Sequence, residues 1–80
     1  MAKWVSVNRY RMVDLRSGRI VVVFQLYPQV KPLESCRLAC DELGVELDAG
    51  HYRLDSLKQD AETKVYRWSR VYRFSLEVNG

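Results

Sequence analysis

The chain has 80 residues, 48% of them hydrophobic and 29% charged, with a formal net charge of +3. This length suits one domain over residues 1–80, and the apolar content excludes an intrinsically disordered chain. The longest apolar run, Ile20 to Phe24, is too short to span a membrane, and two cysteines are too few for a disulfide scaffold. We therefore expect a cytoplasmic protein with no membrane segment and no targeting peptide.

The charge is unevenly distributed along the chain. Residues 1–30 hold five basic and one acidic residue, residues 31–50 hold two and five, and residues 51–80 hold six and four. Nine of the thirteen basic residues are arginine, whose planar fork of donors suits specific contacts with anions. The pattern predicts a basic sheet side and an acidic helix side.

Two strands are predicted at the N-terminal end, at 4–15 and 20–27, joined by residues 16–18. A two-residue turn would put two arginines on the core face. A three-residue loop with a left-handed glycine pairs Tyr10 with Phe24 instead, which avoids burying unpaired charge. In this preferred register, four side chains share the less protected face: Arg9, Arg11, Val21 and Val23.

A helix is predicted to begin near Pro32 and to end at Gly44. Its apolar stripe, which should pack on the sheet, consists of Leu33, Cys36, Cys40 and Leu43. The two cysteines lie one helical turn apart, but a zinc site needs about four ligands, so small buried apolar residues are the favoured interpretation. Residues 45–47 are a candidate short strand.

The C-terminal end predicts strands at 52–57 and 65–78. Strict alternation in the last strand puts Arg67, Val71 and Arg73 opposite an aromatic face that only Arg70 interrupts. That aromatic face consists of Tyr66, Trp68, Tyr72, Phe74, Leu76 and Val78. At fourteen residues the strand exceeds the usual five or six or so, and it must bend, bulge near Arg70 or overhang its neighbour.

These elements predict an α+β fold. We expect one antiparallel β-sheet of four to five strands with a single α-helix packed on one face, in the order β-β-α-(β)-β-β.

Motifs for catalysis are absent from the sequence. His51, the one histidine, has no recognisable serine or cysteine partner, and the glycines are too scattered for a phosphate loop. The acidic residues, which include Asp41, Glu42 and Asp55, are typical of a solvated face. We expect no enzyme activity, no cofactor and no metal.

The arginines and aromatics of the strands are the one constellation that suggests function. The candidate partner-binding residues are Arg9, Arg11, Val23, Tyr27, Arg67, Arg70, Val71 and Arg73. The favoured hypothesis is a non-catalytic protein that occupies the surface of a protein or nucleoprotein complex, because arginine and aromatic residues dominate interface hot spots. The plainer interpretation is that the aromatics form the core of the protein and the arginines simply lie on the solvent-exposed face of the sheet.

Two alternatives remain open. The same arginines could bind DNA or RNA directly, although the predicted aromatic face points away from Arg67 and Arg73, whereas base stacking needs both on one face. A homodimer could form on the last strand or on residues 20–27. In size and lack of motifs the chain is similar in general character to accessory proteins of phages and mobile elements, anti-CRISPR inhibitors among them, which implies an inhibitor. That similarity covers no particular residues.

Overall fold

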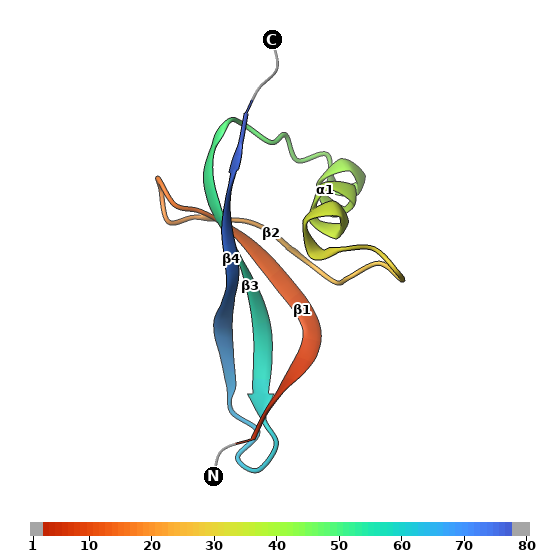
Figure 1. Cartoon of the computed structure of the whole chain (residues 1–80), viewed down its shortest axis with the longest axis vertical. Coiled ribbons are helices and arrows are strands. Elements are labelled where there is room, and N and C mark those ends of the chain that lie inside the picture. The colour runs from red at the N-terminus through yellow and green to blue at the C-terminus, as the bar shows by residue number, and fades with distance from the viewer. Residues whose placement is uncertain (1–2, 78–80) are drawn as a thin grey trace.

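The structure, a computed structural model, describes residues 3–77 as a four-stranded antiparallel sheet with one helix on one face (Figure 1). The predicted α+β fold and its element order are confirmed, except that residues 45–47 form no strand. The strands lie in the order β2-β1-β3-β4. The elements are β1 (Trp4–Asp14), β2 (Ile20–Phe24), α1 (Pro32–Leu43), β3 (Gly50–Asp60) and β4 (Tyr66–Leu76).

The β1–β2 hairpin has the predicted register. Tyr10 pairs with Phe24 and Arg11 with Val23. Its loop is longer than the three residues predicted, because the pairing shifts after Met12 and the Asp14 amide donates to the Arg19 carbonyl at 2.9 Å. The loop between Asp14 and Arg19 therefore has four residues, 15–18. The Asp14 carboxylate accepts the amide hydrogen of residue 16, a side-chain turn that sequence spacing does not reveal.

Helix α1 begins with Pro32 and ends at Gly44, which has the left-handed φ of 69° typical of a helix stop. Its buried residues are Ser35, Cys36, Ala39 and Cys40. The predicted burial of the two cysteines is confirmed, whereas that of Leu43 is wrong, since its side chain is 66% exposed. Leu43 is the last residue of α1 and lines an open groove at the edge of β2, so the core does not enclose it.

The core lies between α1 and the central strands. Met12 and Leu54 are fully buried, and the Cys36 Sγ lies 3.4 Å from the Met12 Sδ. The helix therefore reaches β1, although it packs mainly against β2, whose Val22 and Phe24 belong to the same core. Burial, reinforced by the neighbouring Cys40, raises the pKa of the Cys36 thiol to about 12, so the thiol stays protonated at neutral pH.

Strand β4 contains a bulge that reverses part of the predicted face pattern. Leu54 pairs with Tyr72 and Asp55 with Arg70, so Val71 is an extra residue with no partner of its own. A bulge near Arg70 was one of the predicted alternatives. Because one inserted residue resets the alternation, residues 66, 68 and 70 lie on the face opposite the helix.

The prediction of one continuous aromatic face is therefore wrong. Tyr72, Phe74 and Leu76 pack against the helix-side core, whereas Tyr66 and Trp68 lie on the other face. Val78, the last member of the predicted face, lies outside the described residues.

The molecule is elongated, with extents of 50 × 28 × 17 Å. Helix α1 covers only one half of the sheet, and the half formed by the start of β1 and the turn between β3 and β4 extends past it (Figure 1). Both faces of that distal half are open. Within residues 3–77 no helix is long and apolar enough to cross a membrane.

Candidate functional site

Four arginines gather on the face of the sheet opposite the helix. Arg11 from β1, Arg53 from β3, and Arg70 and Arg73 from β4 line an open hollow of about 460 Å³. Asp55 and Trp68 complete the lining. We call these six residues the arginine face. Four guanidiniums surround one carboxylate, so the hollow carries an excess of positive charge and suits an anion.

Asp55 organises two of these arginines. Its side chain is 3% exposed, and it accepts hydrogen bonds from Arg11 Nε at 2.7 Å and from Arg53 Nε at 2.8 Å. Burial acts to raise the pKa of Asp55, but the two guanidiniums outweigh it and hold the pKa below its ordinary value of 3.8. Asp55 is therefore ionised at neutral pH and fixes both arginines at the sheet surface.

Arg11 also stacks on Trp68, with its Cζ 4.5 Å from the centre of the indole ring. This cation–π contact, worth about 0.5–1 kcal/mol at an exposed site, uses one face of the ring. Arg70 and Arg73 are exposed, and neither belongs to the salt bridges formed among residues 3–77. These two guanidiniums retain their donors for a ligand.

Arg67 and Val71 do not belong to this hollow. Arg67 pairs with Lys58, and its Cζ lies 4.1 Å from the ring centre of Trp4 on the other face of the distal half. The expectation that Arg67 and Arg73 share a face is wrong, because the bulge at Val71 separates them. Val71 itself is 40% exposed.

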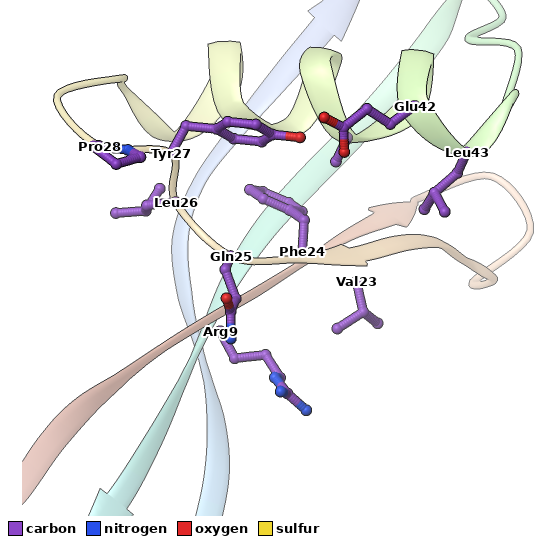
Figure 2. A pocket seen from close by; sticks show the side chains of 10 residues that line it. Arg9, Val23, Phe24, Gln25, Leu26, Tyr27, Pro28, Glu42 and Leu43 are labelled. Atoms are coloured by element: carbon purple, nitrogen blue, oxygen red, sulfur yellow. The ribbon is translucent and has the colours of Figure 1, made fainter.

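The remaining predicted residues, Arg9, Val23 and Tyr27, line a second site, a groove of about 540 Å³ at the free edge of β2 (Figure 2). Arg9 and Val23 point away from the helix, whereas Tyr27 extends beneath it (Figure 2). We call this site the β2 groove. Its other lining residues are Phe24, Gln25, Leu26, Pro28, Ala39, Glu42 and Leu43.

Tyr27 and Glu42 close the helix side of the β2 groove. Their side chains point toward one another (Figure 2), and hydrogen bonding to Glu42 together with partial burial raises the pKa of the Tyr27 hydroxyl. The Tyr27 backbone amide donates to the buried Ser35 Oγ at 3.0 Å, which anchors this segment to the helix. The backbone and the side chain of Tyr27 therefore both hold this wall of the groove in place.

His51 has a serine partner that the sequence did not suggest. Its Nδ1 lies 2.9 Å from the Ser75 Oγ, because the two residues pair across β3 and β4. The pair is exposed and no carboxylate bonds to the imidazole among the described residues, so nothing orients it as a base. Within residues 3–77 no cluster of three His, Cys, Asp or Glu side chains could hold a metal ion.

Sequence reasoning missed Arg53, Asp55 and Trp68. Asp55 was grouped with the solvated acids, whereas Asp41 and Glu42 are exposed and Asp55 is buried. A usable signal was present, because Arg53 and Asp55 are two residues apart on a strand and so share a face. The position of Trp68 depends on the bulge and carried no such signal.

Comparison of the chain with protein-family models, with curated proteins and with solved structures gives no significant match.

Proposed function

We propose that the chain is a non-catalytic binding protein whose arginine face holds an acidic surface of a partner protein or nucleoprotein complex. The observation that carries this proposal is the convergence of four arginines on one open hollow with a single carboxylate. An inhibitor that blocks a partner's surface fits this small, rigid platform.

The internal contacts of the arginine face support this role. Arg11 and Arg53 are fixed by Asp55, so they lose little conformational freedom when a partner binds. Arg70 and Arg73 present free donors beside them, and guanidiniums bind carboxylates through paired hydrogen bonds. Val23, opposite Arg11, supplies apolar contact at the rim.

Direct binding of single-stranded nucleic acid is the second candidate. The bulge at Val71 favours it, because the bulge brings Trp68 and Tyr66 to the face that carries Arg11, Arg53 and Arg73. Tyr66 is 55% exposed and can stack on a base, while the arginines contact phosphates. The sequence-based objection to nucleic acid, that aromatics and arginines point apart, no longer holds for these residues.

Fluorescence anisotropy with three labelled probes tests both candidates. The probes are poly-L-glutamate, single-stranded DNA and single-stranded RNA, matched in length and charge, each measured at about 50 and 200 mM salt. Under the primary proposal poly-L-glutamate binds at least as tightly as the nucleic acids. Tighter binding of DNA or RNA that also falls on Tyr66→Ala selects the second candidate. No binding of any probe at the lower salt discards both.

Charge reversal locates the binding surface. Arg70→Glu combined with Arg73→Glu should weaken binding by roughly a hundredfold or more, since two contacts to charged groups are lost, each worth about 1.5–3 kcal/mol. Arg67→Glu is the matched control, because Arg67 lies on the same strand but on the opposite face. Equal losses in the control and the double variant would mean that the arginine face has no special role.

A further inference from the structure

The sheet has two outer strands, and they differ in their chemistry. β4 carries Arg67, Arg70 and Arg73 and no acidic residue between Tyr66 and Leu76. β2 has the sequence Ile-Val-Val-Val-Phe and carries no charge. Since an outer strand presents unpaired backbone amides and carbonyls, each edge is a template for another strand.

Charge decides which edge can pair with a second copy of the chain. Antiparallel pairing of β4 with its own copy brings arginines of like charge together, which is destabilising. Pairing of β2 with its own copy places only apolar, largely β-branched side chains against one another, which are the residue types most favoured in strands. Proteins usually guard an edge with lysine, proline or a bulge that twists it away. β2 contains neither lysine nor proline, although the register shift after Met12 leaves Val21 as a bulge in it.

The surroundings of β2 also carry exposed apolar surface. Ile20 is 53% exposed, Val23 is 46% exposed and Leu43, at the end of α1, is 66% exposed. Val23 and Leu43 flank the β2 groove from opposite faces of the sheet (Figure 2). Helix α1 packs against β2 and also contacts Met12 on β1, so it lies over this edge of the sheet, and the helices of two paired copies would meet across the joint.

We propose that β2 pairs antiparallel with β2 of a second copy, forming a homodimer with one continuous eight-stranded sheet. Antiparallel pairing of identical edges places the two-fold axis perpendicular to the sheet. Both helices then lie on one side of the joint sheet, and Leu43 of each copy fills the space between them. The groove at the edge of β2 is the unfilled half of this interface.

The dimer has a consequence for binding, which rests on the proposed function. The two arginine faces lie on the same side of the joint sheet, and Arg11 is adjacent to the joint because it pairs with Val23. Eight arginines would thus form one extended basic surface. A partner with repeated negative charge would contact both halves and bind more tightly than either half alone.

Sedimentation equilibrium of the full chain, without any ligand, tests the dimer. We expect twice the chain mass for the wild type at about 100 µM and a monomer for Val23→Lys, with the dissociation constant raised roughly tenfold or more. Val71→Lys is the matched control, because Val71 is a valine of similar exposure, 40% against 46% for Val23, on the other outer strand. It should remain dimeric. Leu43→Lys, on the helix, provides a second interface variant should Val23→Lys fold poorly.

The outcomes separate this inference from the proposed function. A monomeric wild type overturns the dimer but leaves the anisotropy results untouched, and the β2 edge would then be open to a strand of another protein. Dissociation by Val71→Lys but not by Val23→Lys or Leu43→Lys would move the contact to β4 and also overturn the inference. A dimer that binds no anionic probe would retain the β2 pairing and discard the proposed function.

Discussion

At the scale of single residues, Asp55 determines the character of the arginine face. A buried carboxylate between two guanidiniums keeps Arg11 and Arg53 at fixed positions, and removing it would leave two cations facing each other. Breaking a buried ion pair by removing one partner is costly, because the remaining charge loses its compensation.

We therefore expect Asp55→Asn to lower the free energy of unfolding by about 2 kcal/mol, less than for a fully buried pair because both arginines are partly exposed to water. Urea unfolding at neutral pH measures the loss. Asp48→Asn is a suitable control, since Asp48 is an exposed acid that forms no salt bridge among the described residues. A loss below about 0.5 kcal/mol would show that Asp55 does not organise the face.

The same residue predicts an acid-sensitive component of stability. The folded-state pKa of Asp55 lies below its ordinary value of 3.8, so its contribution is complete above that value and is lost as the pH falls through the folded-state pKa. The wild type should lose more unfolding free energy between about pH 5 and pH 2 than Asp55→Asn does. Parallel pH dependences in the two proteins would contradict the assignment.

At the scale of elements, the bulge in β4 sets the composition of both faces. One extra residue, Val71, places Trp68 with Arg11 and moves Arg67 to the face of Trp4. A strand that kept Val71 in a regular ladder would keep its aromatics together and would leave the arginine face without its indole.

Deleting Val71 should remove the bulge and leave this arrangement in place. Arg70 and Tyr72 become consecutive, so they pair with Asp55 and Leu54 in a regular ladder and residues 66–70 keep their present faces. We expect a fold retained by circular dichroism, unchanged tryptophan fluorescence and unchanged binding of the anionic probes. Val71→Gly serves as the control, because it keeps the inserted residue and the register. Altered fluorescence and weaker probe binding in the deletion variant alone would show that residues 66–70 had exchanged faces and would contradict this pairing.

At the scale of the whole molecule, the helix and the core occupy one half of an elongated sheet. Leu54 and Met12 are buried beneath α1, whereas Val5 and Tyr66, in the distal half, are about half exposed. The turn between β3 and β4 is held by backbone hydrogen bonds, such as that from the Ala61 amide to the Lys3 carbonyl at 2.8 Å. The Asp60 side chain also holds it, by accepting a hydrogen bond from the backbone amide of residue 62.

This asymmetry predicts two levels of local stability. Backbone amides of residues 57–60 and 65–68 should exchange with solvent faster than those of residues 51–55 and 72–75, since little apolar surface covers them. Hydrogen exchange followed by NMR on the wild type measures the difference. Uniform protection along β3 and β4 would show that the sheet opens only as a unit.

The sequence determined the fold to a large extent. The alternation in residues 20–24 and the demand to keep Arg9 and Arg11 out of the core gave the correct β1–β2 register, and Pro32 and Gly44 marked the helix ends. These features depend on local backbone chemistry, which the chain carries wherever it folds. The burial of Cys36 and Cys40 followed from helical spacing for the same reason.

Only the tertiary structure decided the composition of the candidate site. The bulge arises where β4 meets β3, and whether Trp68 or Arg67 shares a face with Arg73 depends on that pairing, which lies outside either strand's own sequence pattern. The burial of Asp55 likewise requires Arg11, which is 44 residues away along the chain. The alternation of one strand fixes which neighbours share a face, whereas an inserted residue and a long-range ion pair are set by the strand across from it.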